Sequence, residues 1–188
     1  MKKCVFLYLM ICLVLVSCVE TKMSPTGIVE AYYEGFENGN FDQIRKVIGD
    51  SISIKSGDYV SSYSRNSFYN FFKWDSVLQT QKKLVELNAS GSEVITTISY
   101  SSARYQFLNN NNLTCSYKII FKDEKISMLE ELDCPNANWP AWEKQVNELV
   151  EWIKIHHPEL DGFINDLTMQ GGINYMKALQ LYKNRENP

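Results

Sequence analysis

Between positions 25 and 48, hydrophobic residues recur at the spacing of two short amphipathic helices. Pro25 suits the first turn of the first helix, and Gly39 suits the turn after its last residues. A second helix is predicted over residues 41–48, ahead of the Gly49-Asp50 turn. The apolar face of the first helix consists of Ile28, Val29, Tyr32, Tyr33 and Phe36.

Beyond this turn the pattern changes to the two-residue alternation of β-strands, interrupted by one further helix. Ile52 and Ile54 alternate with serines, and residues 59–64 form a weak strand or a loop. Asn66 or Ser67 would cap the further helix, whose apolar residues are Phe68, Phe71, Phe72, Trp74 and Leu78. Strands are then predicted over residues 82–89, 93–108, 113–122 and 125–133.

This order of helices and strands predicts an α+β fold. The segment IVEAYYEGFENGNFDQIRKVIGDSISI, residues 28–54, resembles the opening of the nuclear transport factor 2-like superfamily, with its helix, Gly-Asn-Phe-Asp turn, second helix and strand. That superfamily includes polyketide cyclase-like and ketosteroid isomerase-like proteins. The resemblance covers residues 25–134. It implies a cone-shaped, curved antiparallel sheet of the cystatin-like kind, packed on the long N-terminal helix with a cavity at its open end.

Residues 135–188 extend beyond this domain and are predicted to be helical. Pro140 suits a first helical turn, and His156-His157-Pro158 would end that helix. A short helix over residues 159–167 and a last one after Gly171-Gly172 would follow. We expect this C-terminal helical extension to lie against the sheet or over the mouth of the cone.

The N-terminal residues 1–17 have the layout of a secretory signal peptide. Lys2 and Lys3 precede an apolar run from Val5 to Val16, which is shorter than the about 20 residues that a transmembrane helix needs. Leu15-Val16-Ser17-Cys18 closes the run and resembles the lipobox of a bacterial lipoprotein signal. The alternative is an ordinary secretory signal with an accidental cysteine.

The lipoprotein resemblance implies that Cys18 becomes the first residue and carries a diacylglyceryl thioether, with an acyl chain such as palmitate on the new N-terminus. Residues 18–24 would then form a tether. Val19 stands where an inner-membrane retention signal usually has Asp. We therefore expect a lipid-anchored protein of the cell envelope, held at the outer membrane of a Gram-negative bacterium through the lipid on Cys18.

Charge and cysteine content narrow the range of partners and cofactors. Loss of Lys2 and Lys3 leaves 17 of the 19 basic residues against 22 acidic ones, which argues against a nucleic-acid partner. Two remaining cysteines and His156-His157 are too few for a convincing metal site, and no motif demands a cofactor. We therefore predict neither a metal nor a cofactor.

The remaining cysteines, Cys115 and Cys134, lie on adjacent predicted strands. A regular ladder places Cys115 opposite Leu132, so Cys134 is a diagonal neighbour at about 7–8 Å, which strains a disulfide. Cys134 ends its strand and could bend inward, and an oxidising compartment favours pairing. Both the bonded and the free state stay open.

Glu130 is the sharpest candidate for chemistry. A two-residue turn at Asp123-Glu124 pairs Lys122 with Lys125 and places Tyr117 opposite Glu130 on the apolar face. Burial there would raise the pKa of the carboxyl group and suit it to act as an acid or base, with Tyr117 as a hydrogen-bond donor. The alternative is a bulge that sends Glu130 and Glu131 to solvent.

Aromatic residues are the other candidates for a pocket. Tyr32, Tyr100, Tyr117 and Trp74 could line the cone, although such residues are more often core packing. Arg104 lies late in the long predicted strand. An inward Arg104 could pair with Glu130 or bind an anionic ligand, but we expect it to face solvent.

Three functions fit these features. The first is a non-catalytic module that binds a small apolar ligand or an envelope protein partner. The second is an enzyme of the isomerase or cyclase type, with Glu130 as acid or base and Tyr117 or Tyr32 as donor. The third is a structural subunit of an envelope complex. A homodimer through the sheet is compatible with each.

Overall fold

In the computed structural model, which describes residues 22–91 and 93–185, two helices precede the first strand, as predicted. The first, α2 (Pro25–Glu37), is capped by Ser24, whose hydroxyl accepts a hydrogen bond from the backbone N–H of Gly27. The second, α3 (Phe41–Val47), is capped in the same way by Asn40. These side chains satisfy N–H groups that a helix start leaves unpaired.

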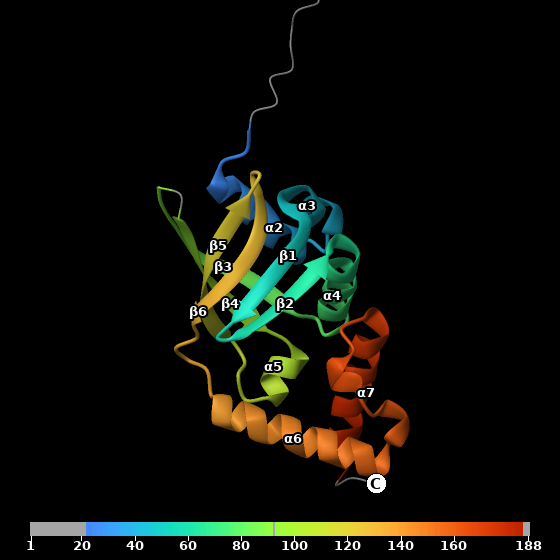
Figure 1. The fold of residues 1–188 in the computed structure, drawn as a ribbon. Helices are drawn as coiled ribbons and strands as arrows, with labels where there is room; N and C mark the ends of the chain where they lie inside the picture. The colour runs from blue at the N-terminus through green and yellow to red at the C-terminus, as the bar shows by residue number, and fades with distance from the viewer. Residues whose placement is uncertain (1–21, 92, 186–188) are drawn as a thin grey trace, which may run out of the picture.

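Six strands form one curved sheet that wraps around α2 (Figure 1). The spatial order is β2-β1-β6-β5-β4-β3. The sheet is antiparallel, as predicted, except for the parallel pairing of β1 with β6. The strands are β1 (Ile48–Ser56), β2 (Tyr59–Ser64), β3 (Gln81–Ser90), β4 (Glu93–Ser101), β5 (Leu113–Lys122) and β6 (Lys125–Asp133).

The β5–β6 hairpin departs twice from the regular ladder. The predicted turn is present, with Lys122 opposite Lys125. A bulge then shifts the register by one residue, so Tyr117 lies opposite Glu131 and not Glu130. A second shift follows between Tyr117 and Ser116. Because side chains alternate along a strand, each shift exchanges the faces of all the residues beyond it.

Two predicted element boundaries were also wrong. The strand predicted over residues 93–108 ends at Ser101, and Ser102 caps a short helix, α5 (Ala103–Phe107), by accepting a hydrogen bond from the N–H of Tyr105. Helix α4 (Arg65–Val77) is capped by Ser64, ahead of the expected cap. In both places a serine hydroxyl fixes the boundary that apolar periodicity does not mark.

The hydrophobic core of the domain lies between α2 and the concave face of the sheet. Val29, Ile52 and Ile98 are fully enclosed in it. Helix α4 closes one side with Phe68 and Phe72.

The C-terminal extension is helical, but its middle part differs from the prediction. Helix α6 (Trp139–His156) and helix α7 (Met169–Lys183) are long. The single helix expected over residues 159–167 is instead two turns of 3-10 helix, η2 (Pro158–Leu160) and η3 (Phe163–Asn165).

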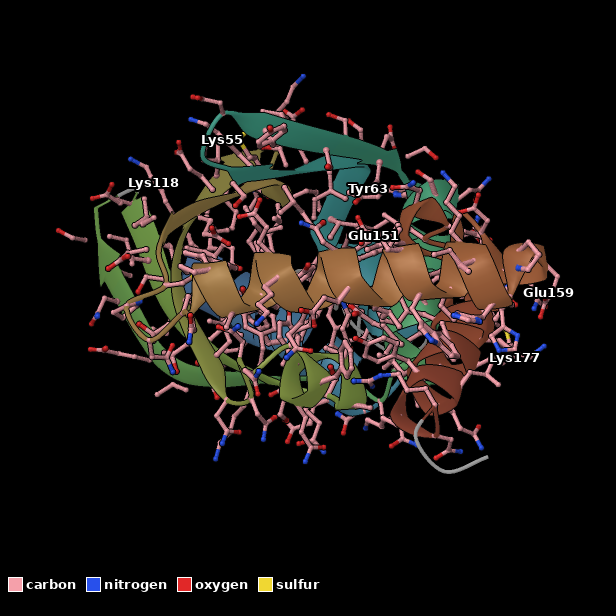
Figure 2. The ribbon with its side chains drawn as sticks, turned by 90° about the horizontal axis from the view of Figure 1, so that it is seen from below. Lys55, Tyr63, Lys118, Glu151, Glu159 and Lys177 are labelled. Carbon is pink, nitrogen blue, oxygen red and sulfur yellow. A yellow bond between two sulfur atoms is a disulfide. The ribbon has the colours of Figure 1, made fainter. Side chains whose placement is uncertain are left out.

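The extension packs on the domain around a second core. Trp74 of α4 and Leu78, the C-cap of that helix, share this core with residues of α6 and α7, among them Ile153 and Tyr175. Figure 2 shows α6 crossing the end of the sheet. The division of the chain at residue 134 stays a prediction. No helix within residues 22–91 and 93–185 has the length and apolar character to cross a membrane.

Candidate ligand-binding cavity

A cavity of about 250 Å³ lies between α2, α4 and the concave face of the sheet. Aromatic side chains dominate its wall, and three charged side chains reach it. The extension contributes one residue, from the loop before α7. The lining residues are Tyr32, Tyr33, Ile54, Phe71, Trp74, Asp75, Lys82, Tyr100, Arg104, Tyr105, Tyr117, Leu129 and Leu167.

All four aromatic residues that the sequence suggested for a pocket line this cavity: Tyr32, Tyr100, Tyr117 and Trp74. Their side chains are buried. Burial disfavours the charged phenolate and raises the pKa of Tyr32, Tyr100 and Tyr117 well above the ordinary value. These hydroxyls are therefore neutral hydrogen-bonding groups in the cavity wall across the physiological range.

Glu130 does not reach the cavity, which corrects the leading catalytic assignment. The β6 bulge turns it to the outer face of the sheet, where its Oε1 accepts a 2.6 Å hydrogen bond from Nζ of Lys55. Lys118, its cross-strand neighbour, lies with Lys55 at the periphery of the molecule (Figure 2). The hydrogen bond and charge of Lys55 lower the pKa of Glu130, the reverse of the expected shift.

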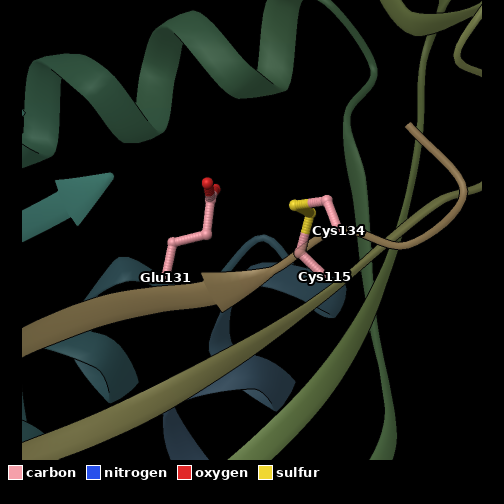
Figure 3. A group of neighbouring side chains, drawn as sticks. All are labelled: Cys115, Glu131 and Cys134. Carbon is pink, nitrogen blue, oxygen red and sulfur yellow. A yellow bond between two sulfur atoms is a disulfide. The ribbon is translucent and has the colours of Figure 1, made fainter. Parts of the chain in front are cut away.

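Glu131 takes the inward position that was assigned to Glu130. It is half-buried and accepts hydrogen bonds from the hydroxyls of Ser56, at 2.7 Å, and Tyr117, at 3.3 Å. Figure 3 shows it beside Cys115 and Cys134. These three side chains have their donor atoms within 4.8 Å of one another, but sulfur atoms joined to each other are not thiolate ligands.

Cys115 and Cys134 form a disulfide, with their Cα atoms 4.1 Å apart. The regular ladder that made Cys134 a diagonal neighbour of Cys115 was wrong. The second register shift in the hairpin pairs Ser116 with Asp133 and thereby brings Cys134 opposite Cys115. The bond closes β6 onto β5 beside the cavity.

An ion pair in the cavity wall was missed at the sequence level. Asp75 Oδ2 lies 2.5 Å from Nζ of Lys82, with angles outside those of a hydrogen bond. Both side chains are about nine-tenths buried. The Lys82 ammonium also lies 3.9 Å from the ring centroid of Phe36. Helical spacing was a usable signal, because Asp75 follows Phe68, Phe71 and Phe72 on one face of α4.

Arg104 also faces inward, contrary to the expectation that it points to solvent. Helix α5, which replaces the end of the predicted strand, turns its guanidinium into a ring of aromatic side chains. Its Cζ lies 4.5 Å from the ring centroid of Trp142 on α6, 5.5 Å from that of Trp74 and 5.8 Å from that of Tyr175 on α7. These distances are those of cation–π contacts.

No carboxylate of the described residues lies within ion-pair distance of Arg104. Its Nε is buried and has no hydrogen-bond partner. Burial raises the pKa of the neighbouring Tyr105 hydroxyl to about 12. The positive charge of Arg104 opposes this shift but is the smaller effect. Arg104 is thus a cation in the cavity wall without a countercharge.

Comparison with known proteins assigns no activity to this chain. The sequence matches no protein-family model and, at significant similarity, no curated protein. Solved structures with similar folds include nuclear transport factor 2-like, cystatin-fold, polyketide cyclase-like and ketosteroid isomerase-like proteins.

Three of these structures illustrate the likeness. A nuclear transport factor 2-like protein of unknown function from Cytophaga hutchinsonii is 10% identical, with 61% of this chain and 93% of that one aligned and a TM-score of 0.49. An uncharacterised cystatin-fold protein from Novosphingobium aromaticivorans is 9% identical, with 56% of this chain and 95% of that one aligned and a TM-score of 0.47. A candidate polyketide cyclase from Xanthomonas campestris is 20% identical, with 64% of this chain and 95% of that one aligned and a TM-score of 0.47.

The fold and cavity define an α+β protein whose curved six-stranded sheet wraps a helix and encloses an aromatic pocket. The predicted signal peptide and the lipid site Cys18 lie outside the described residues. The tether is described only from Lys22, whose Nζ lies 2.6 Å from Oε1 of Glu124 in the β5–β6 turn.

Proposed function

We propose that this chain is a lipid-anchored cell-envelope protein that binds a small molecule in its aromatic cavity without transforming it. The observation that carries the proposal is the cavity of about 250 Å³, bordered mainly by buried aromatic side chains. Ligand sites are concave, largely apolar and marked by a few polar groups, and commonly measure about 300–1,000 Å³. A volume just below that range favours a ligand built around a single ring.

The positions of the acidic groups favour binding over catalysis. Glu130, the expected acid or base, lies on the outer face with Lys55. Asp75 is the one carboxylate among the lining residues, and Lys82 occupies it. A general acid or base must lie within hydrogen-bond distance of the proton that it transfers. The carboxylate of Asp75 is already engaged by Lys82, which opposes its use as an acid or base.

The proposed anchor would set the orientation of the folded domain relative to the membrane. Lys22 follows Cys18 by four positions, a span of at most about 14 Å. Lys22 contacts the β5–β6 turn, at the end of the molecule opposite α6 (Figure 1). A lipid on Cys18 would therefore hold that turn near the membrane and direct the α5–α6 end, where the cavity lies, toward the aqueous compartment.

The anchor is tested by intact-mass spectrometry of the protein extracted from its native membrane. The expected species begins at Cys18 and carries a diacylglyceryl group and an acyl chain. Cys18→Ser is expected to remove the lipid and release the protein from the membrane fraction. A wild-type protein without lipid would contradict the anchor and leave the cavity proposal intact.

Ligand binding is tested with the mature protein in detergent, by native mass spectrometry for a retained ligand and by calorimetry with small aromatic compounds. Leu167→Trp should fill the cavity from a loop and abolish binding. The matched control, Glu130→Gln, changes the outer face and should bind as the wild type does. Equal binding by Leu167→Trp would contradict the cavity as the site.

The same protein preparations also test the enzyme alternative and the expected protein partners. Conversion of a bound compound, lost in Asp75→Asn, would replace the binding proposal with an isomerase-like or cyclase-like one. An envelope protein partner or a homodimer through the sheet would appear as co-purifying chains or as a doubled mass.

A further inference from the structure

We infer that the cavity ligand is a small monocarboxylate whose anionic group binds the guanidinium of Arg104 and the indole N–H of Trp74, in a subsite completed by the C-terminal extension. This inference rests on the proposed function and names the chemical class of its ligand.

The first argument is the charge of the cavity wall. The charged lining residues are Asp75, Lys82 and Arg104. Asp75 and Lys82 neutralise each other at 2.5 Å, which leaves the single positive charge of Arg104. The acidic residue Glu131 is not a lining residue, and its carboxylate accepts hydrogen bonds from the hydroxyls of Ser56 and Tyr117. The cavity is therefore matched to a ligand with one negative charge.

The second argument is a pair of unused donors. Arg104 Nε and Trp74 Nε1 are both buried and have no hydrogen-bond partner within the part of the chain that the structure describes. Trp74 is only 5% exposed, and both residues line the cavity. Buried polar groups in folded proteins are almost always paired, so two unpaired donors on residues that line the same cavity indicate a missing acceptor.

The third argument is how the cation is held. Trp74 of α4, Tyr105 of α5, Trp142 of α6 and Tyr175 of α7 all lie within cation–π distance of the guanidinium. These rings hold the guanidinium without neutralising its charge. A purely structural arginine at this junction would be expected to take a carboxylate partner. The ring therefore fixes Arg104 in place and leaves its charge for a ligand.

A carboxylate fits this subsite better than a phosphate. The planar fork of an arginine binds a carboxylate through two parallel hydrogen bonds. A phosphate monoester carries about −1.5 to −2 charges at neutral pH, which exceeds the one uncompensated charge in the wall. The aromatic lining would then receive the apolar body of the ligand.

The test compares benzoate, benzamide and phenyl phosphate as probes of the mature protein in detergent, by calorimetry. Benzoate is expected to bind at least tenfold more tightly than its neutral isostere benzamide and than phenyl phosphate. Arg104→Gln should weaken benzoate at least tenfold and leave benzamide unchanged. Arg104→Lys keeps the charge without the fork and should lie between. Glu130→Gln should leave every affinity unchanged.

Trp74→Phe gives a second, independent arm, because it keeps an aromatic ring while removing the N–H donor and part of the indole ring. Benzamide experiences the same change of shape, so the expected result is that benzoate weakens several-fold more than benzamide does. Equal affinities for benzoate and benzamide, or an unchanged benzoate affinity in folded Arg104→Gln or Arg104→Lys, would overturn the inference while the proposed function stands. If no probe binds at millimolar concentration, the proposed function fails together with the inference.

Discussion

Replacing Lys82 with methionine tests the energetics of the cavity wall. The substitution keeps a long apolar stem and removes the ammonium that lies 2.5 Å from Asp75 Oδ2. At an effective dielectric constant of about 20, two unit charges at 2.5 Å attract by about 7 kcal/mol. Desolvation of each ion opposes this by several kcal/mol, so the intact pair contributes little net stability.

Removing one partner is different, because Asp75 then stays buried without a countercharge. We expect Lys82→Met to lower the free energy of unfolding by about 3–5 kcal/mol at pH 7. The double variant Asp75→Leu/Lys82→Met should recover most of that loss, since a well-packed apolar pair can replace a buried ion pair. Urea unfolding followed by circular dichroism measures all three proteins.

The matched control is Lys55→Met, which removes the lysine from the Lys55–Glu130 pair on the outer face of the sheet. That pair is partly exposed, with side-chain exposures of 39% and 27% against 10% and 6% for Lys82 and Asp75. Its loss should therefore be much smaller, because water replaces the missing charge. Equal losses in the two single variants would refute the argument from burial.

Three further predictions concern the disulfide, the tyrosines and one glycine. Cys134→Ser opens the Cys115–Cys134 loop, which spans 19 positions, and should cost about 3 kcal/mol in urea unfolding; an equal loss on reducing the wild type is the check. Burial raises the pKa of Tyr117, so the contribution of its neutral hydroxyl to the free energy of unfolding is complete below pH 10 and is lost as the pH rises further. Ultraviolet titration should show this tyrosine ionising only as the protein unfolds. Gly171→Ala would place a Cβ 1.9 Å from the backbone oxygen of Asp166 and should cost about 1–3 kcal/mol, and a thermal melt that matches the wild type would contradict this contact.

Much of the fold could be predicted because periodicity reports which residues are buried. The helix from Pro25 and the strands 113–122 and 125–133 have the predicted positions. Tyr32, Tyr100, Tyr117 and Trp74 were recognised as pocket candidates for the same reason: large aromatic residues on apolar faces converge where the elements meet.

The acidic and basic residues of the site could not be placed in the same way. Glu130 and Glu131 are adjacent, so a single extra residue in the β6 ladder decides which one faces inward. The position of Arg104 depends on Ser102, which ends the strand and begins α5. Such local choices depend on hydrogen bonds that alternation does not report.

The sequence alone determined the class of fold, the order of its elements and the aromatic character of its interior, because each depends on the spacing of apolar residues along the chain. Tertiary structure alone decided which charges meet. It paired Asp75 with Lys82, joined Cys115 to Cys134 and surrounded Arg104 with rings from four helices. The physical reason is that ion pairs, disulfides and cation–π contacts depend on distances of a few ångströms between residues that are far apart in the chain.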